Sequence, residues 1–283
     1  NPFQTDPLDS CVSDSQGGVL VRDGKIFTTG KAEDLKNRFK LAKIVNYGTK
    51  LVVPGFVDAH VHYPQTAIVA SWGKRLIDWL NEYTFPEEMK FHDPVYAKTI
   101  AERFLNLVIS YGTTTCATYT TIHSESVEAI FQAADARSMS IVAGKTCMDR
   151  NAPSGLMDTA QGAYDQSKRL LQTWHGKNRC TYAITPRFAP TSTRQQLTAL
   201  GQLWTEYPNC LMQTHLSEQV EEIAWVKSLY PETRDYLDAY ERAGLLTDRA
   251  IFGHAIHLQE REKDRIKDVG ASLVHCPTSN SFI

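Results

Sequence analysis

Short apolar runs rich in β-branched residues alternate with amphipathic stretches along most of this chain. The runs at residues 51–57, 113–119, 140–143, 180–184, 210–214, 250–252 and 271–274 predict strands. Apolar positions recur with helical spacing between them, most clearly at residues 94–110, 124–137, 193–206 and 260–268. Strands that alternate with helices in this way predict parallel βα units, so we expect an α/β protein.

The first fifty residues follow a different pattern. Residues 18–28 predict two short strands joined by a tight turn at Asp23-Gly24, because Asp-Gly adopts the backbone geometry of a hairpin turn. A short helical stretch and a further strand at residues 43–46 follow. We therefore predict two domains: residues 1–53 form part of a small β-sandwich, and residues 54–283 form the main α/β domain.

Histidines and other ligand-type residues directly follow several predicted strands, which favours a (β/α)8 barrel over an open sheet. The active sites of such barrels lie at the carboxyl ends of the strands. Seven strands are one short of closure, so we expect the intact protein to continue by about 100 residues, enough for one more βα unit and further small-domain strands. We accordingly expect that residues 1–283 by themselves are not an active monomer.

Composition and charge exclude several classes of function. The formal net charge is only -2 and Lys and Arg form no cluster, so we expect no nucleic-acid partner. No apolar run approaches the roughly 20 residues that cross a bilayer, so we expect no membrane partner either. The six cysteines include no CxxC pair, and we interpret them as reduced thiols of a cytoplasmic protein.

The strongest local signal is the sequence PGFVDAHVH, which ends at His62. His60 and His62 are two residues apart on a predicted strand, so their side chains point to the same side. Two imidazoles at a strand end suit a metal such as zinc, although an isolated pair can equally be two ordinary buried histidines. The recurrence of histidine at equivalent places on later strands favours the metal site. Those residues are His215, His254 and His275.

A second signal is Glu218, which lies three residues beyond His215. A carboxylate at this place can move a proton from an activated water molecule to a leaving nitrogen while His215 binds the metal. The alternative is a helix-start carboxylate stabilised by the helix dipole. We favour the proton shuttle for Glu218 and the helix-start interpretation for Glu221 and Glu222.

Motifs from about Gly18 to the end of the chain resemble those of the guanine deaminases, within the amidohydrolase superfamily. They occur in the family's order and are HVHYPQ at 60–65, MDRNAP at 148–153, TPRF at 185–188, HLSE at 215–218, GHAIH at 253–257 and HCPTSN at 275–280. The resemblance implies hydrolysis of guanine to xanthine and ammonia at a single zinc ion, as a step of purine catabolism. We also expect a homodimer.

The resemblance further implies roles for individual residues. It assigns the metal to His60, His62 and His215. It places His254 beside the metal or its water and makes Glu218 the proton shuttle. The substrate contacts that it implies are His62, Tyr63, Pro64, Gln65, Arg187, Phe188, His215 and Glu218.

The chemistry of guanine is consistent with these contacts. Its O6 and N7 are adjacent acceptors that a guanidinium can bind with two donors, so we predict that Arg187 binds them while Phe188 stacks on the ring. Gln65 offers both a donor and an acceptor to another edge of the base. The alternative for Arg187 is a strand-end charge paired with a neighbouring carboxylate.

Two further features bear on the metal site. The strand at 181–186 lacks the lysine that two-metal relatives carry there, so we expect one metal and a structural role for Lys145. The family's last ligand is an aspartate after the eighth strand, and we find no counterpart, because Asp58 is expected to face away from His60. Two other hypotheses stay open: a related ring aminohydrolase or chlorohydrolase, and a catalytically inactive scaffold.

Overall fold

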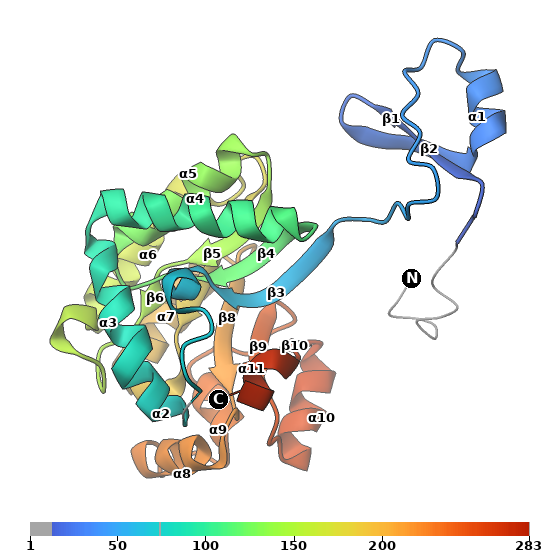
Figure 1. Ribbon diagram of the computed structural model, residues 1–283. Helices are drawn as coiled ribbons and strands as arrows, with labels where there is room; N and C mark the ends of the chain where they lie inside the picture. Colours follow the sequence, from blue (N-terminus) through green and yellow to red (C-terminus); the bar gives the residue numbers. More distant parts are fainter. Residues whose placement is uncertain (1–12, 74, 283) are drawn as a thin grey trace. The chain divides into compact units, whose positions relative to one another are not determined.

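The computed structural model describes residues 13–73 and 75–282. The chain divides into two compact units, Asn1–Pro54 and Gly55–Ile283, and each is described here by itself. Figure 1 labels the helices and strands of both units.

The first unit contains an antiparallel hairpin. Strand β1 (Gly17–Arg22) pairs with β2 (Lys25–Lys31), and helix α1 (Ala32–Arg38) follows. Asp23 and Gly24 both have positive φ, 51° and 72°, as a two-residue hairpin turn requires. The predicted hairpin is therefore confirmed, and the β-sandwich to which we assigned it stays a prediction.

The strand predicted at residues 43–46 is wrong. These residues form no ladder within the described part of the chain, and Ile44 and Val45 are exposed. β-branched residues favour strands only where a partner supplies hydrogen bonds and a packing surface, and neither is present at this place among the described residues.

Seven parallel strands form the main sheet of the second unit, with the order β10-β9-β8-β7-β5-β4-β3. They are β3 (Phe56–His62), β4 (Thr113–Tyr119), β5 (Ser140–Gly144), β7 (Cys180–Pro186), β8 (Leu211–Leu216), β9 (Ala250–His254) and β10 (Ser272–Val274). The two-residue strand β6 (Thr146–Cys147) also pairs with β7. The sheet is a nearly closed parallel barrel, which confirms the predicted fold class.

Strand β3 begins at Phe56, where its backbone N–H donates to Gly112 O, and not at residue 51 as predicted. Leu51 is 84% exposed and Pro54 lacks a backbone donor, so the apolar run before Phe56 joins no ladder in the described structure. The other six predicted strands begin within one residue of the observed ones.

Helices cover the outer side of the strands (Figure 1). The predicted helices are present as α4 (Pro94–Ser110), α5 (Ser124–Ala136), α7 (Arg194–Glu206) and α10 (Glu260–Val269). The sequence reading did not single out α6 (Ala160–Trp174), α8 (Val220–Leu229), α9 (Tyr236–Arg242) or α11 (Pro277–Phe282). Polar caps begin several helices: the side chains of Asp93 and Thr193, for example, accept backbone N–H groups of α4 and α7.

A helical run between β3 and α4 lies at the carboxyl ends of the strands. It includes η1 (Tyr63–Ile68), α2 (Leu76–Trp79), the π-helical turn η2 (Leu80–Thr84), α3 (Phe85–Glu88) and η3 (Met89–His92). A small apolar cluster packs this run against the strand ends, and its buried members are Leu76, Leu80, Phe85, Met148, Leu156 and Phe188. The larger apolar core joins the sheet to its outer helices. The carboxyl ends of the strands are thus covered by a packed helical run.

The five described cysteines are free thiols, and four of them are buried. No helix among residues 13–73 and 75–282 has the length and apolar composition needed to cross a membrane.

Candidate functional site

Three histidines converge where β3, β8 and β9 end. One ring nitrogen each of His60, His215 and His254 lie within 4.8 Å of one another, and the rings of His215 and His254 stack at 5.4 Å. Parallel strands bring their carboxyl ends to one edge of the barrel, which is why residues so far apart in sequence meet here. This spacing allows all three imidazoles to bind one ion.

Hydrogen bonds fix which ring nitrogens face the centre of the cluster. Nδ1 of His215 lies 2.7 Å from the carbonyl of Arg187, and Nδ1 of His254 lies 2.8 Å from Oδ1 of Asn280. Both partners accept, so each Nδ1 carries the proton and each Nε2 keeps its lone pair. Nε2 of His60 is buried and has no hydrogen-bond partner among the described residues. An orphaned imidazole nitrogen is what a metal site leaves in a structure that carries no ligands.

His62 lies beside this cluster. Its Nε2 is 3.0 Å from Nε2 of His215, and its ring stacks on Tyr119 with centroids 4.5 Å apart. The structure thus brings His60 and His215 together as expected, but the third histidine within mutual reach is His254. The assignment of His62 to the metal stays a prediction, and His254 joins the candidate ligands.

Burial keeps these imidazoles neutral at physiological pH. Desolvation, with a smaller contribution from His254, lowers the pKa of His60 to about 3. Desolvation also holds the pKa of His62 and His215 well below the ordinary value, and it lowers the pKa of His254. Neutral imidazoles are the metal-binding form, so the cluster needs no proton release before it binds a cation.

The close approach of β9 to His60 depends on a glycine. A Cβ atom at Gly253 would lie 2.4 Å from Cε1 and 2.5 Å from Nδ1 of the His60 ring. Non-bonded heavy atoms do not approach so closely, so a side chain at this position would require the imidazole or the strand to shift. Gly253 therefore provides the space that His60 occupies.

Glu218 faces the histidine cluster from the end of β8. Its Oε1 is 3.3 Å from Nδ1 of His254, and its side chain is buried. Burial raises the pKa of Glu218 to about 8, Glu222 adds to the rise, and Arg187 opposes it. A cation bound by the neighbouring histidines would lower this pKa again, into the range where a carboxyl both accepts and donates a proton near neutrality.

Glu222 has the helix-start role that we predicted for it. It forms a capping box with Gln219 at the start of α8, and its Oε2 accepts the backbone N–H groups of Glu218 and Gln219. Glu221 is in the first turn of α8 and is exposed. The cap holds the backbone of Glu218 in place at the mouth of the cluster.

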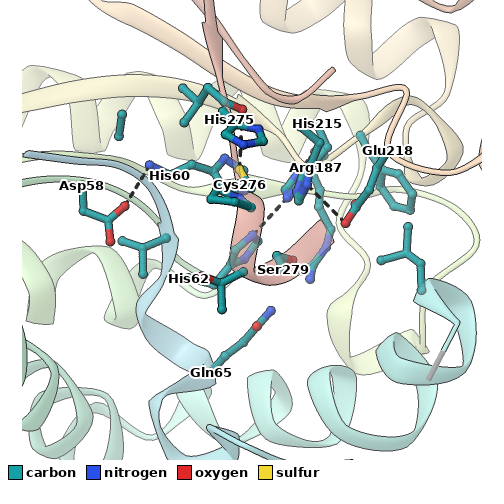
Figure 2. A pocket seen from close by; sticks show the side chains of 18 of the residues that line it. Asp58, His60, His62, Gln65, Arg187, His215, Glu218, His275, Cys276 and Ser279 are labelled. Atoms are coloured by element: carbon teal, nitrogen blue, oxygen red, sulfur yellow. Dashed lines mark hydrogen bonds and ion pairs between the residues drawn. The ribbon is translucent and has the colours of Figure 1, made fainter. Parts of the chain in front are cut away.

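A pocket of about 640 Å³ opens in front of the histidines. Figure 2 shows Gln65 and Glu218 reaching toward it from different sides. Its lining includes His60, His62, His215, His254 and Glu218 together with the predicted substrate contacts Gln65, Arg187 and Phe188. Polar groups and an aromatic ring thus meet in one cavity that can take a small ring compound.

Arg187 fits both interpretations proposed from its sequence position. Its Nη1 donates to Oε1 and Oε2 of Glu88, at 2.9 and 2.6 Å, so it is paired with a carboxylate. It also lines the pocket, and its backbone carbonyl accepts from the His215 ring. Sequence reasoning missed Glu88, because a pairing across 99 residues leaves no local signal.

Tyr63 and Pro64 do not line this pocket. The Tyr63 side chain has no exposed surface, its hydroxyl donates to Ser126 O at 2.6 Å, and its ring packs against Phe91. Both residues are buried in the 3-10 turn that follows β3. Their side chains shape the base of the helical run, and the substrate contacts inferred for them stay predictions.

Asp58 was expected to face away from His60, and this stays a prediction. Its Oδ1 accepts the backbone N–H of His60 at 3.2 Å, and it borders the pocket with its strand neighbours. The pairing of β3 with β4 is irregular between Asp58 and Val61, so simple alternation does not fix the side of the strand that Asp58 occupies. Lys145, by contrast, has the expected structural place: it is fully buried and paired with Asp158.

Three of the eight described non-glycine residues with positive φ lie at the ends of β8 and β9. Ser217, His254 and Ala255 have positive φ of 49°, 67° and 51°. Non-glycine residues rarely adopt this conformation, which persists where surrounding contacts enforce it, often at functional sites. Here it turns the chain just after His215 and at His254, where the two rings meet.

Comparison with known proteins gives the site a context. The model of the amidohydrolase family matches residues 51–283. The guanine deaminase of Escherichia coli (strain K12) is 44% identical over 268 residues, which are 94% of this chain and 61% of that protein. The chain thus spans about three fifths of that relative's length.

Solved structures agree with this match. The guanine deaminase of C. acetobutylicum, solved with bound guanine in the active site, superposes with a TM-score of 0.88 at 33% identity, over 93% of this chain and 63% of that one. A variant atrazine chlorohydrolase of Arthrobacter aurescens TC1, in complex with zinc and atraton, superposes with a TM-score of 0.80 at 18% identity, over 93% and 62%. The second likeness shows the fold alone.

Proposed function

This chain belongs to the amidohydrolase family, and we propose that it hydrolyses guanine to xanthine and ammonia with the help of one zinc ion. The observation that carries the proposal is the convergence of His60, His215 and His254 with Glu218 in one pocket that also holds Arg187 and Phe188. Among the possible ring substrates we choose guanine, because the chain is similar to guanine deaminases.

The donor set fits a zinc ion. Neutral imidazoles are borderline ligands that zinc prefers, and buried nitrogens of His60 and His62 have no other partner in the described residues. His60 and His215 would hold the ion together with a third imidazole, that of His62 as the sequence predicts or that of His254, which lies within reach of both. A zinc ion bound there supplies Lewis-acid activation of a water molecule.

Glu218 performs the proton transfers in this proposal. As a carboxylate it takes a proton from the attacking water, and as an acid it gives that proton to the amino nitrogen that leaves C2 of guanine. Its burial allows both forms near neutral pH. Oε1 of Glu218 lies 3.3 Å from Nδ1 of His254, which places the carboxyl beside the histidine cluster.

Arg187, Phe188 and Gln65 would orient the base. Arg187 keeps N–H donors for the carbonyl oxygen and N7 of guanine, Phe188 offers a ring face, and Gln65 can bind another edge. A substrate held on several sides reacts faster, because its orientation is fixed before the reaction.

The decisive experiment is an assay of the intact protein with zinc on guanine, with xanthine quantified by chromatography. Adenine, a diaminotriazine and a chlorotriazine form the comparison panel. We expect xanthine from guanine and little conversion of the others. Preferential release of chloride from the triazine would favour a chlorohydrolase, and a folded protein that converts none of the compounds would favour an inactive scaffold.

We also propose a cytoplasmic homodimer. The five free cysteines that the structure describes support a reducing compartment. Analytical ultracentrifugation of the intact protein tests the dimer, and a single species at the monomer mass would contradict it.

A further inference from the structure

An ion pair in the wall of the pocket joins Glu88 of α3 to Arg187 after β7. Glu88 has no exposed surface and Arg187 has 3%. Nη1 of Arg187 contacts both carboxylate oxygens, at 2.6 and 2.9 Å. The guanidinium carries five N–H donors, and no other hydrogen bond from it is found among the described residues. The donors on Nε and Nη2 are therefore available to a molecule in the pocket.

Arg187 is also fixed from other directions. Its guanidinium carbon lies 5.5 Å from the centre of the Phe85 ring, one turn before Glu88 in the same helix. Its backbone carbonyl accepts from the backbone N–H of His215 at 3.2 Å and from Nδ1 of the same residue at 2.7 Å. The backbone end of the arginine is thus held by the histidine cluster, and the charged end is held by α3.

The helix that carries Glu88 is part of a helical run that borders the pocket. It continues from the π-helical turn Leu80–Thr84, and the preceding residues Leu76, Trp79 and Leu80 line the same pocket. π-helical turns insert an extra residue into a helical run and occur frequently at functional sites. One helical run thus supplies both apolar lining and the carboxylate behind the arginine.

We propose that Glu88 is a positioning residue that sets substrate selection: it holds Arg187 so that its remaining donors meet a carbonyl oxygen on a neutral ring. This inference rests on the function proposed above. The carboxylate neutralises the guanidinium, so the pocket carries no net positive charge at this wall and has no preference for anions. The fixed donors bind an acceptor and are left unpaired by an amino group, which presents donors of its own.

The opposite charges of Glu88 and Arg187 compensate each other in the buried wall of the pocket. Burial raises the pKa of Glu88, and Arg187 is the group that opposes this rise. Substitution of either partner would leave the other charge buried without compensation, whereas substitution of both would not. This property separates a positioning effect from a general loss of folding.

The test uses the intact zinc-loaded protein with guanine and 2,6-diaminopurine, which carries an amino group in place of the carbonyl oxygen. Glu88→Gln should raise KM for guanine by at least ~10-fold while kcat changes less than ~3-fold, because the lost contact is made in both the bound and the transition state. The preference for guanine over 2,6-diaminopurine should fall by at least ~10-fold. Glu88→Asp should retain part of the preference.

The matched control is Glu87→Gln, since Glu87 is the adjacent residue, is also buried and forms its own ion pair with Lys90 at 2.6 Å. It should leave KM and the preference unchanged. In an Arg187→Gln background, Glu88→Gln should have no additional effect on KM, because Glu88 acts through the arginine. The double variant leaves no buried charge unpaired. If Glu88→Gln does not fold, KM and the substrate preference are therefore measured on the double variant and on Glu88→Asp.

An unchanged KM and preference in Glu88→Gln would overturn the inference, as would additive effects of the two substitutions or an equal effect of Glu87→Gln. Failure of the proposed function would appear separately, as a parent protein that forms no xanthine. In that case both proposals fall together.

Discussion

Proton positions on single histidines decide how this site can bind a cation. A carbonyl and an amide oxygen accept from Nδ1 of His215 and His254, which leaves the Nε2 lone pair of both rings available to a cation. Outer hydrogen bonds of this kind orient metal-binding imidazoles and raise their basicity. The arrangement of the cluster therefore depends on residues that never touch the ion.

His60→Ala should remove most of the bound zinc, because loss of one ligand also removes the geometry that holds the others. Zinc content of the purified protein, measured by elemental analysis, checks this. The control is His92→Ala, since His92 is exposed and contacts Met89 O outside the cluster. Full zinc occupancy in His60→Ala would contradict the metal assignment. The same measurement on His62→Ala and His254→Ala would show which of the two binds the ion.

Glu218→Gln should retain zinc and reduce kcat by about 10²–10⁴-fold, because an amide preserves the shape but cannot accept and return the proton. Steady-state kinetics on guanine with parallel zinc analysis makes the measurement. Glu221→Gln is the matched control, since it is an exposed carboxylate of the same helix start. A Glu218→Gln protein within a few-fold of the parent rate would rule out the shuttle.

The sequence was informative about residues that follow strands and uninformative about their partners. Histidines at strand ends can be found by position alone, and His60 and His215 meet as expected. Glu88 and Asn280 could not be found in this way, because their importance lies in contacts with Arg187 and His254 that only the fold creates. Nothing local separates Glu88 from Glu87 beside it.

At the scale of elements, hydrophobic periodicity predicted the strands and helices of the second unit well and those before Phe56 less well. Strand β4 and helix α4 have the predicted bounds, because buried apolar patterns and a capping Asp93-Pro94 pair both mark them. The apolar run before Phe56 and the stretch at 43–46 misled the prediction, since a strand also needs a neighbour. The local sequence does not indicate whether a neighbouring strand is present.

The fit between β9 and β3 leads to a prediction about Gly253. Gly253→Ala should weaken zinc binding by at least ~10-fold, because the new methyl group would displace the His60 ring. Competition with a chromophoric chelator measures the affinity. Gly30→Ala in β2 is the control, as a methyl group there would meet nothing within 4 Å. Unchanged affinity in a folded Gly253→Ala protein would show that the strands separate easily.

At the scale of the whole sheet, β3 and β10 each pair with one neighbour among the described residues. Open strand edges bind other chains unless charge or cover protects them. Phe56 and Val57 on β3 and Leu273 on β10 are exposed apolar residues at these edges. A polypeptide of residues 1–283 would therefore expose two unpaired strand edges with apolar side chains.

Such a polypeptide should self-associate at concentrations on the order of 10 µM, and light scattering after gel filtration measures this. Val57→Lys with Leu273→Lys should reduce the association, since charged edge residues oppose pairing. Val95→Lys, at a comparably exposed position on α4, should not. A monomeric parent polypeptide with guanine deaminase activity would refute the prediction.

The backbone carbonyl and the guanidinium of Arg187 respond differently to substitution of this residue. Its carbonyl, which orients His215, belongs to the backbone and is present whatever residue occupies the position. Its guanidinium, which faces the pocket, is encoded by the side chain alone. Mutation at 187 can therefore alter which ring the pocket accepts while the contact that orders the histidine is kept. Directed selection at positions 88 and 187 together should therefore yield proteins that bind other rings and keep the proposed metal site.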